Sequence, residues 1–365
     1  MLRAFGSPHR YVQGPGALDQ LGELAGGYGK HPLVIADGIV LALLRQRLEA
    51  SLGPLAGATR FAEFGGECTA DEIARLGAEA GAAGADVVIG VGGGKAIDTA
   101  KGVRIQLDRP LIIVPTIASN DSPTSRLVVV YTKDHVLHEV RAMPVNPDAV
   151  LVDTAVIIGA PERFFVSGVG DALSKKFEAE QCFATGGNNF YKARPPYLAL
   201  TLADACYAAI RAHAEGALAA SRAKQLSEDF ERTVEATILL SGLAFENGGL
   251  SIAHSMTRGL STVPELARAL HGEQVAFGLL VQLVLEERPA AFVADLVDFY
   301  GRMGLPCSLA QLGYPGDPAG VAAQIARHTW ERAPYVRALI KPVDEARLER
   351  AVLAADALGA GSRAK

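Results

Sequence analysis

Residues Ala85–Lys101, with the sequence ADVVIGVGGGKAIDTAK, contain the pattern on which the fold assignment rests. The apolar run Val87–Val91 has the composition of a buried strand and leads directly into GGGK at Gly92–Lys95, after which a helix is expected from about Ala96. Glycines permit a tight turn and a close approach of backbone N–H groups to a ligand, and a helix N-terminus adds unpaired donors and partial positive charge. The segment therefore predicts a strand–loop–helix unit that suits a pyrophosphate, and a simple tight turn is the alternative. The pattern is neither G-x-G-x-x-G nor that of a P-loop.

The first half of the chain repeats this alternation of strand and helix. Other short runs rich in Val and Ile, of the kind found in strands buried on both faces, are Leu33–Ala36, Leu111–Val114, Leu127–Tyr131 and Val150–Val152. The helical patterns are Ala17–Leu24, Val40–Leu52, Ala70–Ala82 and Ala96–Leu107. Strands that alternate with helices predict a parallel sheet wrapped by helices.

The composition changes after Ala160–Pro161, where Ala and Leu become dominant. Helical spacing recurs in Tyr197–Ile210, Phe230–Phe245, Val275–Leu285, Ala290–Met303, Val321–Thr329 and Ala346–Leu358. A chain of 365 residues is also long for a single core. We therefore expect an α/β domain over residues 1–160 and an all-helical domain over residues 161–365.

The bulk composition excludes several classes of protein. The net charge is −5, and no block of Lys and Arg indicates binding to nucleic acid or to an anionic membrane surface. No uncharged apolar run reaches the roughly 18–20 residues that span a bilayer, and Met1–Gln20 lacks the apolar core of a signal peptide. The cysteines are far apart, at Cys68, Cys182, Cys206 and Cys307. We expect reduced, mostly buried thiols in a cytoplasmic protein.

Two further features suit a dinucleotide. Asp37 follows the strand Leu33–Ala36, where a carboxylate can accept both ribose hydroxyls and would repel a 2′-phosphate; a helix N-cap is an equally good interpretation. Pro115–Ser119 follows the strand Leu111–Val114, at the end of a parallel strand where ligands bind. A polar turn would also explain this second segment.

Three residues of the second half have the chemistry of a metal site. Asp171 follows Gly170 at an expected helix start, His254 lies in an apolar segment, and His271 precedes the helix Val275–Leu285. One carboxylate and two imidazoles suit a catalytic divalent ion with an open position. Taken singly, however, each residue also fits a structural role as an N-cap, a core histidine or a helix start. The two histidines are too far apart in sequence to share one helical face.

An ordered set of segments resembles the glycerol dehydrogenases, a branch of the group III metal-dependent alcohol dehydrogenases with a dehydroquinate synthase-like fold. The matching segments are Ser7–Gly14, Phe64–Thr69, Ile89–Lys101, Pro115–Ser119, Asp121, Pro123, Ile157–Pro161, Gly168–Ala172, Phe245–Leu250 and His271–Gly278. The resemblance implies an α/β nucleotide domain followed by a helical domain, with the active site in the cleft between them. It also implies a homo-oligomer, often an octamer.

The resemblance assigns roles to individual residues. Asp171, His254 and His271 would hold Zn²⁺, and Asp121 would form a hydrogen bond with a hydroxyl of a small polyol. NAD would be bound by Asp37, Gly93, Gly94, Lys95, Asp98, Thr116, Ser119, Ser125, Leu127 and Tyr131. The implied reaction is the NAD-dependent oxidation of glycerol to dihydroxyacetone, or of a similar vicinal diol, by hydride transfer to the nicotinamide.

The sequence departs from the family pattern at three places. Lys175 stands where iron-dependent relatives carry a histidine four residues after the metal aspartate, which favours zinc. We expect Lys175 to point outward or to pair with a carboxylate such as Glu178 or Glu180. Thr257 stands where the family often has another histidine. The residues that flank Asp121 also differ from the expected Thr, Ala and Cys, and are Asn120, Ser122 and Thr124.

Two other functions remain open from the sequence. A dehydrogenase or reductase of 2-hydroxy acids would need a cation for the carboxylate, for which Lys175 or Arg126 is a candidate. A lyase or cyclase similar to dehydroquinate synthase would need a cluster of Lys and Arg for a phosphate, and only Arg258 lies close to His254 in the sequence.

Overall fold

The computed structural model describes residues 2–134 and 137–361, which form two compact units. The α/β unit comprises Gly6–Pro161 together with the short segment Ala223–Leu226. Of the described residues, the helical unit comprises 2–5, Glu162–Arg222 and 227–361. All the residues proposed to bind a nucleotide lie in the α/β unit, and the three candidate metal ligands lie in the helical unit.

A six-stranded sheet is the framework of the α/β unit, with strand order β1-β8-β5-β4-β2-β3 and all neighbours parallel. The strands are β1 Arg10–Gly14, β2 Pro32–Ala36, β3 Arg60–Glu63, β4 Val87–Gly92, β5 Leu111–Pro115 and β8 Ala149–Asp153. Every residue of the four inner strands is buried, which explains why they read as continuous apolar runs. The predicted parallel sheet is confirmed.

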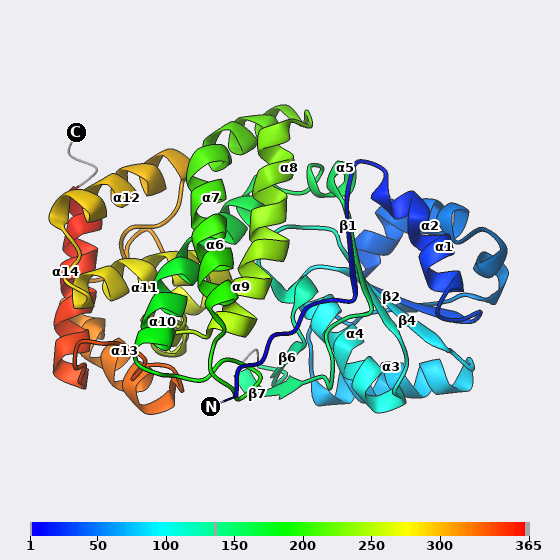
Figure 1. Ribbon diagram of the computed structural model, residues 1–365, viewed down its shortest axis with the longest axis horizontal. Coiled ribbons are helices and arrows are strands. Elements are labelled where there is room, and N and C mark those ends of the chain that lie inside the picture. Colours follow the sequence, from blue (N-terminus) through cyan, green and yellow to red (C-terminus); the bar gives the residue numbers. More distant parts are fainter. Residues whose placement is uncertain (1, 135–136, 362–365) are drawn as a thin grey trace. The chain divides into compact units, whose positions relative to one another are not determined.

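Helices cover both faces of this sheet (Figure 1). The helical elements of the unit are η1 Ala17–Gln20, α1 Leu21–Gly26, α2 Gly38–Leu52, η2 Gly53–Ala58, α3 Ala70–Ala82, α4 Gly94–Leu107, η3 Ser122–Thr124 and α5 Thr154–Ile157. Ile89 of β4 packs in one apolar cluster with Leu21 and Leu48 from the side of α1 and α2. The next residue, Gly90, faces the other way, and a Cβ there would lie 2.6 Å from Ala100 Cβ of α4. The glycine therefore lets α4 lie close to the sheet.

The strands β1, β3 and β6 differ from the inner strands because each is only partly buried. The edge strands β1 and β3 contain few buried residues, so they lack a continuous apolar run. Leu127–Tyr131 was expected to be buried on both faces, and that expectation was wrong. It forms β6, which pairs antiparallel with β7 Leu137–Ala142 in a separate two-stranded sheet. Val128 and Val130 are buried while their neighbours are partly exposed, as in a strand covered on one face.

The helical unit contains α6 Glu162–Ala184, α7 Tyr197–Ala223, α8 Glu228–Glu235, η4 Ala236–Leu240, α9 Ser241–Gly248, α10 Ile252–Leu260, η5 Leu266–Arg268, α11 His271–Leu285, α12 Ala290–Met303, α13 Ala319–Arg332 and α14 Glu345–Gly361. The helix expected over Phe230–Phe245 is divided, because η4 is a turn of π-helix between α8 and α9. Such turns insert one residue into the helical ladder.

Asp171 lies in the middle of α6, so the expectation of a helix start at this residue was wrong. The glycines that suggested a boundary serve the packing of two helices instead. A Cβ on Gly170 would lie 2.6 Å from Gly272 O, and one on Gly272 would lie 1.8 Å from Ser167 O. Only glycine allows the backbones of α6 and α11 to approach this closely. Tertiary contact has thus overridden the local helix-breaking tendency of glycine.

All four cysteines are buried and none forms a disulfide, as expected. Burial raises the pKa of the Cys68 thiol to about 12 and that of Cys182 to about 11. Both groups are therefore protonated at neutral pH.

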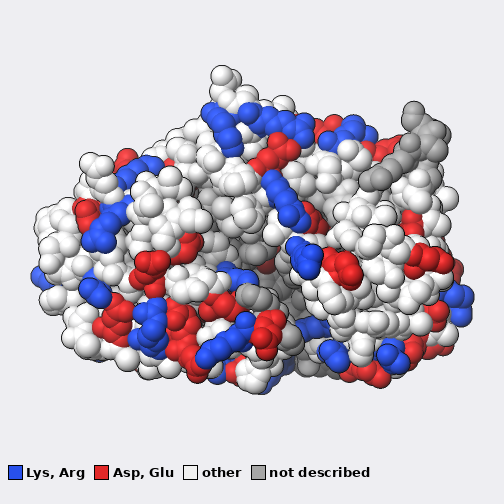
Figure 2. Space-filling model, turned by 180° about the vertical axis from the view of Figure 1, so that it is seen from behind, with Lys and Arg blue, Asp and Glu red and all other residues white. Residues whose placement is uncertain are grey.

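Charges of both signs alternate over the face shown in Figure 2, without a broad area of Lys and Arg alone. Among the described residues, no single helix has the length and hydropathy needed to cross a bilayer. The segments Glu228–Gly248 and Ile252–Leu260 meet those criteria only when taken together, and they are bent by 96° relative to one another.

Candidate metal centre and nucleotide-binding loop

Three helices of the helical unit bring Asp171, His254 and His271 together. His254 Nε2 lies 3.2 Å and His271 Nε2 lies 3.8 Å from Asp171 Oδ1. One ligand atom from each residue lies within 4.8 Å of the others. Ligand atoms around a tetrahedral zinc ion are about 3.3 Å apart, because each bond is close to 2 Å. The three separations therefore suit a single divalent ion.

The three side chains differ in exposure. Asp171 is on α6 with 1% of its side chain exposed, and His254 of α10 has 11% exposed. His271 is the first residue of α11, which begins four residues earlier than the expected helix Val275–Leu285, and 45% of its side chain is exposed. The group is thus closed around Asp171 and open at His271. An open side is what a catalytic ion needs to admit a substrate.

Glu178 of α6 holds His254 from behind. Glu178 Oε2 lies 2.5 Å from His254 Nδ1, and Glu178 Oε1 accepts the backbone N–H groups of His254 and Ser251 at 2.9 Å. A carboxylate behind a metal-binding histidine fixes the tautomer that leaves Nε2 free for the ion. The sequence alone did not predict this role for Glu178. A signal for it was available, because Asp171, Lys175 and Glu178 follow the i, i+4, i+7 spacing of one helical face.

Lys175 was expected to point outward or to pair with Glu178 or Glu180, and the outward orientation was wrong. Its side chain is fully buried, and Nζ donates to Asp171 Oδ1 at 2.7 Å. Nζ also lies 3.0 Å from His254 Nε2. A buried carboxylate without a cation is strongly disfavoured, which explains the inward position of the ammonium group.

The buried charges of this cluster compensate one another. Burial raises the pKa of the Asp171 carboxyl, but the Lys175 ammonium and the hydrogen bond with His254 hold that pKa well below its ordinary value. Burial alone would lower the pKa of His254. The Glu178 carboxylate acts in the opposite direction, and the pKa of His254 is raised to about 9. Both carboxylates are therefore ionised at neutral pH and face positively charged or hydrogen-bonding partners.

The donor set fits a divalent ion. Asp171 Oδ2 is buried and makes no hydrogen bond with any described residue, so this carboxylate has an unused acceptor oxygen. Oxygen and imidazole nitrogen are ligands that zinc accepts. Lys175 opposes the ion, because its ammonium lies within hydrogen-bond distance of Asp171 Oδ1 and of His254 Nε2.

In the α/β unit, the glycine loop connects β4 to α4 as predicted. Gly93 is the N-cap of α4, whose first residues are Gly94 and Lys95. Gly92 has φ +148°, a conformation that side chains disfavour, and its backbone O accepts the N–H of Thr116 at 3.0 Å. A Cβ on Gly93 would lie 2.8 Å from Ile117 Cδ1. The loop therefore packs against the segment that follows β5, and both features suit close approach to a phosphate.

Asp37 is the N-cap of α2, where its Oδ1 accepts the Val40 backbone N–H at 2.9 Å. A Cβ on Gly92 would lie 3.9 Å from the other oxygen, Asp37 Oδ2. The carboxylate thus both caps a helix and lies beside the glycine loop. The two interpretations left open by the sequence are compatible with each other.

Asp98 is buried and connects α4 to the segment that carries Asp121. Its Oδ1 accepts hydrogen bonds from Lys101 Nζ at 3.0 Å and Ser122 Oγ at 2.7 Å, and its Oδ2 accepts the Val129 N–H at 3.0 Å. Lys101 Nζ donates in addition to the backbone O of Ser122 and of Leu127. Through these contacts Asp98 and Lys101 hold the segment in place, a role that no local sequence pattern indicated.

The other predicted residues lie along the same part of the unit. Lys95 Nζ pairs with Glu67 Oε2 at 2.6 Å and lies 5.6 Å from the centre of the Tyr131 ring. Ser125 Oγ lies 3.4 Å from the ammonium of Lys101. Ser119 is partly buried, and Asp121, which precedes η3, is 7% exposed.

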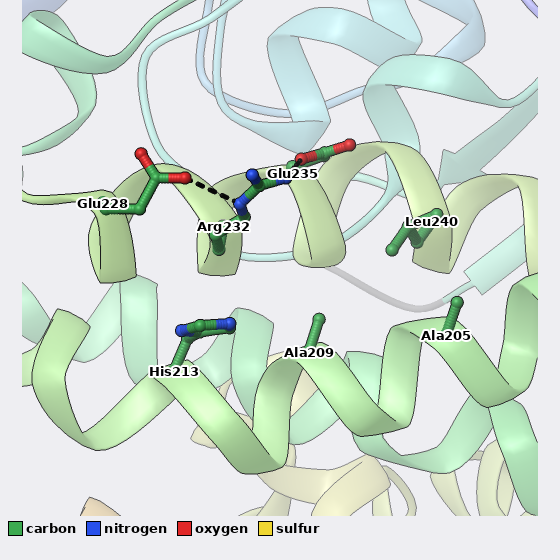
Figure 3. Close-up of a pocket in the computed structure, with 7 residues that line it drawn as sticks. All are labelled: Ala205, Ala209, His213, Glu228, Arg232, Glu235 and Leu240. Carbon is green, nitrogen blue, oxygen red and sulfur yellow. Dashed lines mark hydrogen bonds and ion pairs between the residues drawn. The ribbon is translucent and has the colours of Figure 1, made fainter.

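A separate hollow of about 570 Å³ lies on the helical unit between α7 and α8 (Figure 3). Ala205, Ala209 and His213 line one side, and Arg232 lies between Glu228 and Glu235 on the other. None of the lining residues is a predicted site residue, so we assign the hollow no part in the chemistry.

Residues 8–154 match the family of iron-containing alcohol dehydrogenases. The glycerol dehydrogenase of Citrobacter freundii is 37% identical over 359 residues, which cover 98% of both chains. The chain belongs to the iron-containing alcohol dehydrogenase family. The resemblance inferred from the sequence is thereby confirmed, and this family member is an oxidoreductase.

Two further comparisons describe the branch of the family. The glycolaldehyde reductase of Halobacterium salinarum is also 37% identical over 359 residues, covering 98% of each chain. The crystal structure of a probable glycerol dehydrogenase from Sinorhizobium meliloti superposes with a TM-score of 0.92 at 37% identity, covering 99% of both chains. These relatives favour an alcohol or aldehyde substrate over the lyase or cyclase alternative.

Proposed function

We propose that this alcohol dehydrogenase oxidises a small vicinal diol, glycerol to dihydroxyacetone or a close analogue, with NAD as the hydride acceptor and zinc as the metal. The observation that carries the proposal is the meeting of Asp171, His254 and His271 in a chain that is 37% identical to a glycerol dehydrogenase over nearly its full length.

Asp171, His254 and His271 would hold the ion, with the open position on the side of His271. When bound, the ion supplies a Lewis acid that lowers the pKa of a substrate hydroxyl. Glu178 supports this role, because it holds the Nδ1–H of His254 and leaves Nε2 directed at the ion. The choice of zinc over iron rests on the absence of a fourth imidazole at position 175, where the chain has lysine.

The α/β unit supplies the groups for NAD. The N–H groups at the start of α4 suit the pyrophosphate, and the Asp37 carboxylate beside the glycine loop suits a ribose diol. Asp98 and Lys101 would hold the segment that carries Asp121, and Asp121 would accept a hydrogen bond from a substrate hydroxyl. An ionised carboxylate accepts hydrogen bonds only, so it favours a neutral diol over a carboxylate substrate.

The 2-hydroxy acid alternative loses one of its two expected cations. Lys175 is fully buried and held by Asp171 and His254. A substrate carboxylate would have to displace Lys175 from one of these partners. The arrangement therefore supports the diol.

The test is a panel of polyols and 2-hydroxy acids assayed with NAD⁺ by the absorbance of the reduced cofactor, before and after chelation and after addition of zinc or iron. His271→Ala should abolish metal-dependent diol oxidation, whereas His213→Ala, on the hollow between α7 and α8, should leave it unchanged. A preference for hydroxy acids, or full activity in metal-free His271→Ala, would refute the proposal.

A further inference from the structure

The buried Lys175 shares its contacts with the atoms proposed to bind the metal. Its ammonium lies 2.7 Å from Asp171 Oδ1 and 3.0 Å from His254 Nε2, and 5.3 Å from the centre of the Phe245 ring. Fully buried lysines are rare unless they are paired. Here the partners include two of the three candidate metal ligands.

The decisive contact is with His254. An imidazole nitrogen has one lone pair, and at 3.0 Å there is room for one proton between Nε2 and Lys175 Nζ, whichever group carries it. A metal bonded to Nε2 at about 2.0–2.1 Å needs that same lone pair. The ion and this hydrogen bond therefore exclude one another.

Asp171 is different, because its carboxylate has two oxygens. Oδ1 accepts from Lys175, while Oδ2 is buried and has no hydrogen-bond partner among the described residues. The carboxylate has an acceptor for each of the two cations. Lys175 thus has to leave His254 when an ion binds, whereas Asp171 has a second oxygen, Oδ2, that Lys175 does not occupy.

We propose that Lys175 is a resident cation that occupies the metal's place on His254 in the metal-free protein, so that a divalent ion binds only by displacing it. The inference rests on the proposed function only in taking these three residues as a metal site. It follows that Lys175 weakens metal binding.

The chain offers a matched pair of variants. Lys175→Met keeps a long side chain but removes the charge and the hydrogen-bond donors. Lys175→Gln, which keeps an N–H donor toward Asp171, is the second variant if the methionine variant folds poorly. Lys176→Met is the control, since Lys176 is the next residue of α6 and pairs instead with Glu180 and Asp204.

The measurement is the dissociation constant for Zn²⁺ in stripped protein, obtained by competition with a chromogenic chelator. We expect Lys175→Met or Lys175→Gln to bind zinc at least about tenfold more tightly than wild type. Substitution of residues that contact metal ligands commonly changes the affinity by this factor. The affinity of Lys176→Met should equal that of wild type. Zinc should also raise the melting temperature of the Lys175 variants by more than that of wild type.

Equal zinc affinity in wild type and both Lys175 variants would overturn the inference, and so would weaker binding in the variants. These outcomes are separate from those of the proposed function. If the protein binds zinc and oxidises diols but the Lys175 variants have wild-type zinc affinity, only the inference about Lys175 fails. If the Lys175 variants bind zinc more tightly but the protein does not oxidise diols, only the proposed function fails.

Discussion

Glu178 contacts both the ring and the backbone of His254. One carboxylate oxygen lies 2.5 Å from Nδ1, and the other accepts the backbone N–H at 2.9 Å. This double contact connects α6 to the start of α10 and fixes which ring nitrogen carries the proton. The orientation of His254 is therefore a property of the fold and does not require a bound ion.

Replacing Glu178 by Gln should weaken zinc binding by about 10- to 100-fold, because an amide can donate to Nδ1 and so stabilise the wrong tautomer. The dissociation constant of the purified variant measures this effect. Glu180→Gln is the control, since Glu180 pairs with Lys176 and Arg288 and does not contact the histidine. Unchanged affinity in Glu178→Gln would show that Glu178 does not support a ligand.

Replacing Asp37 by Ser should narrow the preference for NAD over NADP. Serine caps a helix about as well as aspartate, so α2 keeps its N-cap while the charge that repels a 2′-phosphate is lost. The ratio of kcat/KM for the two cofactors tests this expectation. Asp37→Ala separates the two roles, because it should shift the ratio similarly and also lower the free energy of unfolding by about 1 kcal/mol. A wild-type enzyme that uses both cofactors equally would contradict the assignment.

Wild type should prefer glycerol or 1,2-propanediol over lactate by at least about tenfold in kcat/KM, the ratio that corresponds to 1.4 kcal/mol. Asp121→Asn keeps the size of the side chain and removes its charge. This variant should lose diol activity and show a smaller penalty on lactate, because repulsion of the substrate carboxylate is removed. The two substrates are compared in wild type and variant at saturating NAD⁺. An unchanged ratio in the variant would exclude Asp121 from substrate selection.

Gly272→Ala should destabilise the fold and weaken zinc binding together. The added Cβ would meet Ser167 O at 1.8 Å, so α11 has to move away from α6 and carry His271 with it. Overpacking of this kind typically costs about 1–3 kcal/mol. Gly301→Ala in α12 is the control, since its Cβ would have no atom within 4 Å, and it should be neutral or mildly stabilising. Denaturant unfolding and zinc titration of both variants provide the comparison.

The sequence by itself determined the features that depend on local pattern. The fully buried strands β2, β4, β5 and β8 are apolar throughout, and the glycine loop stands between a strand and a helix, so both could be predicted. The apolar run Val275–Leu285 likewise predicted the helix that His271 begins. The grouping of the metal candidates came from resemblance, because their spacing alone does not place them on one surface.

Only the tertiary structure decided the rest, since it depends on contacts between distant segments. Gly170 lies within α6, where the close packing of α11 requires a residue without a side chain. The strand β6 belongs to a separate two-stranded sheet, and its alternate residues are buried. Lys175 is buried beside Asp171 because a carboxylate removed from water needs a cation nearby. Local composition contains no information about which side chain from another helix will meet that charge, and the packing of α6, α10 and α11 therefore determined the chemistry of the site.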